Sequence, residues 1–460
     1  MQALRYFDIF NVQQHFFPNK HALGHLKAGK KITFHAQTIQ SLVNNMACNL
    51  IDYGLKKGDY VCLFGHTTDS WWIIAELAIS SAGGIIVPIE TNPDNLDETI
   101  EQLKTTQSKC CFVFHLETLK YIERFQEQIS SLKYIFNFDK QFVSPEKHYL
   151  FNNPSPESLI TLESLKGVIH EDDLAFLLYT RGTTSKPKGI LLSHKNILEN
   201  AKAFLKFSPL AEEHRHLSIT HIAHSFERVV ITALVLCGAS TFFQSGEENF
   251  YFATKRIKPH FLSMSTVECL NFMKKLTDND SQSSQAKNQI RTALKICGKN
   301  LDNFNLSFSD WFRIRIINLF LFRQWRKKLG NKIKAIYVIG SPLNSLAAKF
   351  FYLAGIEIKE GYGLTEATAL VSLNGHTQNT YRAKTSGQII PNLKVKIEEP
   401  NIKGIGEIFI KGPSVMRAYF SGIDEQPSFT MKEDWMSTGD LGYLSKDGFL
   451  TIIDRSEVQA

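Results

Sequence analysis

The segment Leu177–Gly189 brings hydroxyl groups, glycines and lysines together directly after an apolar run. Its sequence is Leu-Leu-Tyr-Thr-Arg-Gly-Thr-Thr-Ser-Lys-Pro-Lys-Gly. Backbone N–H groups, hydroxyl donors and mobile positive charge suit the binding of a polyphosphate. A Walker P-loop is excluded, because Pro187 stands where its second glycine would fall and Gly189 stands where its serine or threonine would follow the lysine. The segment therefore predicts a phosphate-binding loop of another kind.

A second segment, Thr220–Glu227, contains His221, His224 and Glu227 at intervals of three residues. This spacing is compatible with a metal site, although no HExxH pattern accompanies it and no matching ligand pair stands out elsewhere. A buried, hydrogen-bonded histidine is the other interpretation of His221. The residues alone leave both open.

Four later segments place glycines or charged groups at strand ends: Ala335–Leu343, Ile358–Ala367, Trp435–Tyr443 and Phe449–Arg455. Small residues let a backbone approach a flat ring closely. Gly361-Tyr362-Gly363 is not a dinucleotide fingerprint, because Glu366 stands where the third glycine would fall. An ionised carboxylate such as Asp440 accepts hydrogen bonds from two neighbouring hydroxyls.

Taken in order, these segments resemble the motifs of the adenylate-forming enzymes, in particular the long-chain fatty-acid–CoA ligase branch. The loop resembles Tyr-Thr-Ser-Gly-Thr-Thr-Gly-x-Pro-Lys-Gly, with Arg181 in place of serine and Ser185 in place of glycine. Thr220–Glu227 resembles Leu-Pro-Leu-Ala-His-x-x-Glu, and the Ile-Ile-Asp-Arg ending at Arg455 is typical of that branch. The resemblance covers almost the whole chain.

The resemblance implies a role for each matched residue. The groups that act on the polyphosphate are Thr180, Thr183, Thr184 and Lys188, and Mg²⁺ is bound by Glu366 with Thr184. Tyr362 stacks on adenine, Thr365 contacts the α-phosphate, and Asp440 and Arg455 reach the ribose. The remaining nucleotide-binding residues are Gly182, Gly340, Ser341, Pro342, Gly361 and Gly363. His224 lies near the acyl substrate.

The implied reaction has two steps. A fatty carboxylate attacks the α-phosphate of Mg-ATP and gives acyl-adenylate and pyrophosphate, and the thiol of coenzyme A then displaces AMP. Family members continue past the arginine into a small α+β lid, whereas residues 456–460 here predict a truncated hinge. We therefore expect no lid on this chain and weak adenylation without one, because closure completes such sites. A lid on a separate chain is an alternative.

Other functions remain open at this stage. A nucleotide- and acyl-binding pseudoenzyme fits Arg181 and Ser185, since a side chain at a position that needs positive φ costs about 1–2 kcal/mol. Arg181 either pairs with the β- and γ-phosphates or fills their site. An acyl-adenylate ligase that uses an acyl-carrier protein as acceptor is the third hypothesis. Acyl chain length stays open, with tunnel walls expected near 224–243 and 337–343.

The hydrophobic periodicity predicts an α/β fold, with helices over Thr38–Tyr53, Trp71–Ser81 and Leu96–Thr105 and strands over Tyr60–Phe64, Gly84–Ile89 and Cys110–Phe114. Alternating strands at Leu393–Ile397 and Gly406–Ile410 predict a small β subdomain. We expect one adenylate-forming N-terminal domain over 1–455. It comprises two stacked α/β subdomains, about 1–380, and a small β-barrel-like subdomain, about 383–453.

Composition limits the ligands and the cellular location that we expect for the protein. The chain has 460 residues, 43% hydrophobic content and a net charge of +7, without a nucleic-acid-binding signature. Its seven cysteines lack CxxC spacing, which predicts reduced, mostly buried thiols, and the first residues show no secretory signal, so we expect a cytoplasmic protein. The basic, aromatic stretch 311–328 has two interpretations, a core helix with solvated ends or a helix lying on a membrane surface.

Overall fold

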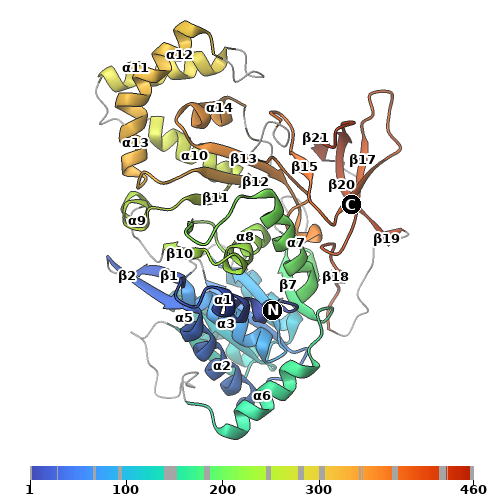
Figure 1. Ribbon diagram of the computed structural model, residues 1–460. Coiled ribbons are helices and arrows are strands. Elements are labelled where there is room, and N and C mark those ends of the chain that lie inside the picture. The colour runs from blue at the N-terminus through green and yellow to red at the C-terminus, as the bar shows by residue number, and fades with distance from the viewer. Residues whose placement is uncertain are drawn as a thin grey trace.

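The computed structural model describes residues 3–27, 29–65, 69–91, 96–138, 153–180, 187–244, 250–277, 284–299, 306–340, 343, 345–375, 382–423, 431–432 and 434–455. Within these residues the strands form three sheets (Figure 1). Two are large and mostly parallel, and the third is small and antiparallel. The α/β fold class predicted from the sequence is confirmed.

The seven-stranded sheet has the order β18-β8-β7-β4-β3-β5-β6. Its strands are β3 (Tyr60–Gly65), β4 (Ile85–Glu90), β5 (Cys110–Val113), β6 (Tyr134–Asn137), β7 (Leu174–Tyr179), β8 (Gly189–Ser193) and β18 (Ala418–Phe420). β3 to β7 pair in parallel, whereas β8 and β18 are antiparallel additions at one edge. The predicted phosphate loop therefore connects two paired strands, β7 and β8.

The nine-stranded sheet has the order β15-β14-β13-β12-β11-β9-β10-β1-β2. Its strands are β1 (His21–Lys27), β2 (Lys30–His35), β9 (Arg215–Ser218), β10 (Ser240–Gln244), β11 (Phe261–Ser265), β12 (Ala335–Ile339), β13 (Glu357–Tyr362), β14 (Ser372–Leu373) and β15 (Gln388–Ile389). β1 comes from the N-terminus, yet it lies beside β10 in parallel.

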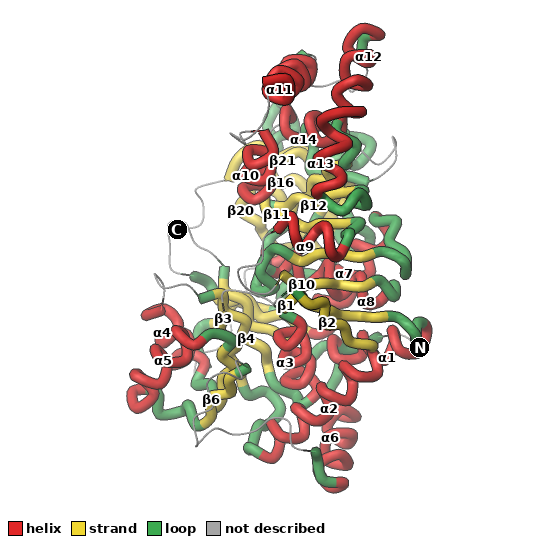
Figure 2. Tube along the Cα trace, turned by 90° about the vertical axis from the view of Figure 1, so that its left-hand side faces the viewer, coloured by secondary structure: helices red, strands yellow, loops and turns green. Residues whose placement is uncertain are grey.

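A layer of helices separates the two large sheets, as the views in Figures 1 and 2 show. It contains α1 (Ile9–Phe16), α2 (Ala36–Asp52), α3 (Ser70–Ser81), α7 (His194–Phe207) and α8 (Ser225–Leu236). In α3 every residue but Trp71 is buried, and α8 is buried from Phe226 to Val235. Helices that are mostly apolar and buried on nearly all sides belong inside a large core, and these two occupy its centre. The predicted helices at 38–53 and 71–81 are thus confirmed.

Strand alternation divides the apolar residues between this central core and two outer ones. In β10, Phe243 faces the central helices while Phe242 faces the opposite side. In β4, Ile86 and Val87 divide in the same way, because successive side chains of a strand point to opposite faces. Each large sheet is therefore covered on both faces.

The outer layers contain the remaining helices. α4 (Leu96–Thr106) and α5 (Leu116–Phe125) cover the seven-stranded sheet, and α6 (Pro156–Val168) packs on α2. The nine-stranded sheet is covered by α9 (Phe250–Ile257), α10 (Thr266–Thr277), α11 (Ser284–Gly298), α12 (Phe308–Ile317), the π-helical turn η4 (Asn318–Phe322), α13 (Arg323–Lys328) and α14 (Ser345–Leu353).

The third sheet confirms the small β subdomain. β17 (Gly406–Lys411) pairs with β16 (Lys394–Glu398) and β20 (Trp435–Leu444), and β20 also pairs with β19 (Met431–Lys432) and β21 (Leu450–Arg455). The burial of β17 alternates strictly, as its period-two sequence predicts. Ile408, Ile410 and Met436 join the central core, so this sheet packs against the larger body.

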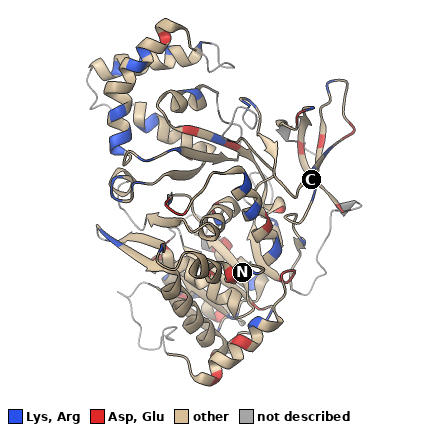
Figure 3. Cartoon of the chain, in the orientation of Figure 1, with Lys and Arg blue, Asp and Glu red and all other residues tan. Residues whose placement is uncertain are grey.

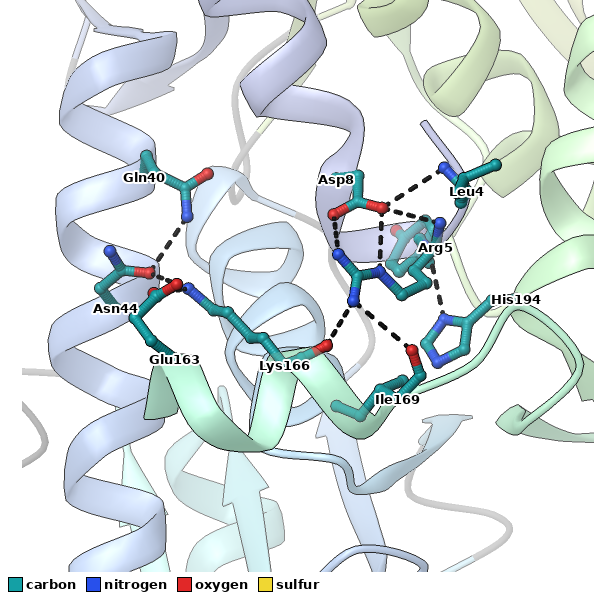
Figure 4. A network of polar contacts seen from close by, with 10 residues as sticks. Leu4, Arg5, Asp8, Gln40, Asn44, Glu163, Lys166, Ile169 and His194 are labelled. Atoms are coloured by element: carbon teal, nitrogen blue, oxygen red, sulfur yellow. Dashed lines mark hydrogen bonds and ion pairs between the residues drawn. The ribbon is translucent and has the colours of Figure 1, made fainter. Parts of the chain in front are cut away.

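The N-terminal segment is held to the body by a polar network (Figure 4). The Arg5 guanidinium pairs with Asp8 at 3.0 Å and donates to the carbonyls of Lys166 and Ile169 at the end of α6. The Tyr6 N–H donates to Nδ1 of His194 at 3.2 Å. Burial lowers the pKa of His194 to about 4, so the ring is neutral and can accept this bond.

The cysteines agree with the prediction of reduced, mostly buried thiols. All seven cysteines are free, and only Cys237 is not fully buried. Burial raises the pKa values of Cys62, Cys237 and Cys269, which keeps these thiols protonated. Among the described residues, no helix has the length and apolar character needed to cross a bilayer.

Candidate active site

The predicted phosphate loop begins and ends in a fixed hairpin. The Thr180 N–H donates to the Lys188 carbonyl at 3.0 Å, and the Lys188 N–H donates to the Thr180 hydroxyl at 3.1 Å. Between them, Arg181, Gly182, Thr183, Thr184 and Ser185 lie outside the described residues. The ends of the loop are thus anchored at the edge where β7 and β8 meet.

Lys188 and Glu366 are joined through Tyr419. The Lys188 ammonium lies 5.7 Å from the centre of the Tyr419 ring, and the Tyr419 hydroxyl donates to Glu366 Oε1 at 3.3 Å. Tyr419 belongs to β18, which pairs with β8 directly after Lys188. Two predicted residues that are far apart in sequence therefore approach one another across the two large sheets.

Glu366 and Thr365 belong to a single 3-10 turn, η5 (Thr365–Ala367), that follows β13. The Glu366 carbonyl accepts from the Met416 N–H at 2.7 Å, and the residue is 8% exposed. Asn200 of α7 holds the far side of the turn, because its Nδ2 donates to the Leu370 carbonyl at 2.9 Å and its Oδ1 accepts from the Leu370 N–H at 3.1 Å. The carboxylate therefore projects from a rigid turn.

A second contact between predicted residues joins Tyr362 and Asp440. Tyr362 ends β13 and is buried, and its hydroxyl donates to Asp440 Oδ2. Asp440 lies in β20 directly opposite Arg455 of β21. The backbone of Arg455 is described, but its side chain is not. The nine-stranded and the small sheet therefore meet where the resemblance predicts adenine and ribose.

Three of the predicted glycines, Gly340, Gly361 and Gly363, lie at the ends of the neighbouring strands β12 and β13. Gly361 pairs with Ile339, the last residue of β12, so that Gly340 follows immediately beside it. Gly340 has φ of +122°, a conformation that favours glycine. A Cβ on Gly363 would lie 1.6 Å from the Ala369 carbonyl oxygen, so no side chain fits there. Ser341 and Pro342 lie outside the described residues.

His224 lies at the start of α8, where its Nε2 is 3.7 Å from Glu90 Oε2 at the end of β4. His221 is buried, and its Nδ1 accepts from the Ala223 N–H at 3.0 Å. This contact agrees with the hydrogen-bonded interpretation of His221. Among the described residues, no group of three or more histidine, cysteine or acidic side chains is arranged to share a metal ion.

The third residue of that motif, Glu227, has a different environment. It is fully buried, accepts from the Ser263 hydroxyl, and lies 3.8 Å from His216 Nε2. His216 Nε2 is also 2.9 Å from the Ser263 hydroxyl oxygen. Burial raises the pKa of Glu227 to about 8 and lowers that of His216 to about 3. Both groups are therefore neutral near pH 7, and the pair is a hydrogen-bond network rather than an ion pair.

This shift predicts a pH-dependent stability effect for Glu227→Gln. In the unfolded chain the Glu227 carboxyl loses its proton near pH 4.5, whereas in the folded protein it keeps the proton to about pH 8. As the pH rises between these values, the free energy of unfolding of the wild type therefore falls. Glutamine stays neutral. The variant should therefore gain roughly 2–4 kcal/mol on the wild type between pH 5 and 8.

Urea unfolding at the two pH values measures this gain, and the exposed Glu101→Gln on α4 serves as the control. If the free energy of unfolding depended on pH equally in Glu227→Gln and in the wild type, the Glu227 carboxyl could not be neutral in the folded protein.

A pocket of about 620 Å³ opens beside the ends of β9, β10 and β11. Its apolar wall includes Phe250, Tyr251, Met264 and Phe272. Glu268, at its edge, accepts from the hydroxyl of Thr220, the first residue of the histidine motif. Ligand pockets commonly span roughly 300–1,000 Å³ and are mostly apolar. The lining residues flank the expected tunnel segments, which remain a prediction.

Two positioning residues were not predicted from the sequence. Tyr419 follows the strand motif at 406–412, but nothing in its spacing shows that it contacts Glu366. Asn200 gives no signal either, because its partner Leu370 is 170 residues away.

The fold agrees with the comparisons to known proteins. The AMP-binding enzyme family matches residues 10–420, and the chain therefore belongs to that family. It is 26% identical to the long-chain-fatty-acid–CoA ligase ACSBG2 of Xenopus laevis, over 89% of this chain and 57% of that protein. It is 25% identical to the long-chain-fatty-acid–CoA ligase FadD15 of Mycobacterium bovis, over 89% of this chain and 67% of that protein.

Solved structures show the same fold. A long-chain-fatty-acid–CoA ligase (FadD1) of Archaeoglobus fulgidus superposes with a TM-score of 0.73 at 16% identity, over 98% of this chain and 84% of that one. The N-terminal domain of FACL13 of Mycobacterium tuberculosis gives a TM-score of 0.71 at 17% identity, over 99% of this chain and 100% of that one. The chain thus matches an N-terminal domain of this fold over its full extent.

Proposed function

We propose that this chain forms the adenylation site of a long-chain fatty-acid–CoA ligase. The observation that carries the proposal is the convergence of Lys188, Glu366, Tyr362 and Asp440 where the three sheets meet, through contacts that join them in pairs. The named ligases among its relatives support the reaction class. In this proposal ATP, a fatty acid and coenzyme A are the substrates.

The charges at this site suit an attack of a carboxylate on a polyphosphate. Mg²⁺ would be held by the Glu366 carboxylate with Thr184, and it would offset phosphate charge when bound. Lys188 and Thr180 lie at the base of the loop, where an ammonium and a hydroxyl can donate to phosphate oxygens. Asp440 accepts from Tyr362 and keeps lone pairs for the ribose hydroxyls.

The acyl group would enter beside His224. We infer that the fatty chain occupies the apolar pocket at the ends of β9 to β11, since Thr220 links that pocket to the histidine motif.

The domain limits, 1–455 with a β subdomain from about 383, are part of this proposal. The proposal also includes a lid domain that acts on the site and is either continuous with this chain or supplied by another chain. The free, mostly buried cysteines support a cytoplasmic location.

The test is the binding of AMP to an Asp440→Asn variant. Asparagine is isosteric but loses the charge that strengthens hydrogen bonds from ribose, so AMP should bind at least about tenfold more weakly. Calorimetry on the wild type and the variant measures the difference. Tyr362→Phe is the matched control, because it removes the hydroxyl that donates to Asp440 and keeps the ring. An unchanged affinity in Asp440→Asn would place the ribose elsewhere.

A further inference from the structure

One side of the rod formed by α12, η4 and α13 is buried and the opposite side is exposed. The three elements follow one another without a break and project from the body (Figures 1 and 2). Ile317, Phe322 and Trp325 pack into the outer core of the nine-stranded sheet. The structure thus fixes the rod in place while leaving its outer side free of contacts with that core.

The exposed side carries a stripe of large apolar side chains, contrary to the usual pattern of a surface helix. Its large side chains are Phe308, Trp311, Phe312, Ile316, Leu319 and Phe320. Phe308 is 82% exposed, Leu319 59% and Phe320 57%. Most of these residues recur at intervals of three or four, which places them along one stripe of a helix. A contiguous exposed stripe of this kind marks a binding surface.

Basic residues flank this stripe. The segment 284–334 contains twelve lysines and arginines but only two acids, Asp302 and Asp310. Asp310 is already paired, with Lys299 Nζ at 3.0 Å and Arg313 Nη1 at 3.7 Å. Figure 3 shows the resulting concentration of lysine and arginine along α11, α12 and α13. The exposed stripe therefore lies in a strongly positive part of the molecule.

A groove of about 380 Å³ in the rod combines both properties. Its apolar wall includes Trp311 and Leu319, and its basic wall includes Arg315, Arg323 and Arg326. The Arg315 guanidinium lies 5.0 Å from the centre of the Trp311 ring, and Arg326 donates to the Ala354 carbonyl at 2.7 Å. Among the described residues, no carboxylate lies within ion-pair distance of these three arginines. The groove therefore presents guanidinium groups that no carboxylate of the described residues neutralises.

We propose that this rod docks on the surface of an anionic phospholipid bilayer. The apolar stripe would enter the interface between headgroups and acyl chains, while Arg315 and Arg323 bind a lipid phosphate in the groove. Trp311 suits this boundary, because tryptophan places an apolar ring and a polar N–H at the same depth. Docking of this kind lays the rod along the surface, and it does not require adenylation.

Vesicle sedimentation tests this docking on the whole chain. Vesicles of phosphatidylcholine mixed with phosphatidylglycerol should bind it at least about tenfold more tightly than vesicles of phosphatidylcholine alone, and salt should weaken the binding. The double variant Leu319→Glu with Phe320→Glu should lose this binding at least tenfold, since it places charge on the stripe. Ile402→Glu, on an exposed turn of the small sheet, is the matched control and should bind like the wild type.

The arginines are tested separately by Arg315→Gln with Arg323→Gln, which should weaken binding to the anionic vesicles alone. Soluble glycerol phosphate as competitor should displace little protein, because a free headgroup lacks the acyl interface. Equal binding to both vesicle types, or unchanged binding of the Leu319 and Phe320 variant, would overturn the proposal. A dimer in sedimentation velocity that this variant dissolves would also overturn it, by assigning the stripe to a second copy.

Discussion

Replacing Glu366 by glutamine should lower ATP–pyrophosphate exchange at least about a hundredfold, as expected when charge stabilisation of the transition state is removed. Glutamine has the shape of glutamate and its amide oxygen still accepts from the Tyr419 hydroxyl, so the turn should persist. It lacks the negative charge that, in the proposed site, would hold Mg²⁺ against the phosphates. Exchange with palmitate and Mg²⁺ measures the loss.

Tyr419→Phe is the matched comparison for this variant. It removes only the hydroxyl that donates to Glu366 and keeps the ring beside Lys188. One such hydrogen bond contributes about 1 kcal/mol, so exchange should fall by less than about tenfold. If Glu366→Gln kept wild-type exchange, the metal would have to be bound by other residues.

Replacing Gly363 by alanine should prevent stable folding of the site. The new Cβ would lie 1.6 Å from the Ala369 carbonyl oxygen and 2.7 Å from the Ala369 carbonyl carbon. This backbone cannot move aside easily, because Asn200 holds the adjoining Leu370 by two hydrogen bonds. Forced overpacking against a fixed backbone exceeds the usual cost of about 1–3 kcal/mol, so we expect a loss of at least about 3 kcal/mol.

Urea unfolding of the variant measures this loss. Gly298→Ala is the control, because a Cβ there meets nothing within 4 Å and its φ is not in the left-handed region. That variant should unfold at the wild-type urea concentration or slightly above it. An unfolding midpoint of Gly363→Ala equal to that of the wild type would show that the close approach at Ala369 is not rigid.

Much of the fold was predictable because local periodicity and packing agree. The helix expected at 38–53 is α2, and the strand expected at 60–64 is β3. The strands β1 and β2 were not predicted. β1 begins and ends in polar residues, and its position is set by pairing with β10, more than 200 residues away. Non-local pairing of this kind leaves no local signal in a single sequence.

The candidate site likewise contains residues that the sequence predicts and residues that it does not. The residues that contact one another in pairs, such as Tyr362 with Asp440, are predictable from the resemblance of short sequence motifs. The residues that hold them, Tyr419 and Asn200, act through contacts across the fold, which spacing does not reveal. For the stretch 311–328, periodicity could not decide between a core and a surface helix. The structure shows a buried face and an exposed apolar face on the same rod.

Palmitate-dependent ATP–pyrophosphate exchange by the wild-type chain, alone and with a ligase lid domain supplied, tests the proposed adenylation site most directly. We expect exchange that requires both palmitate and Mg²⁺, increases when the lid is supplied, and falls at least about a hundredfold in Glu366→Gln. Tight AMP binding without exchange under any of these conditions would contradict it. The chain would then be a nucleotide-binding protein that retains the fold without the chemistry.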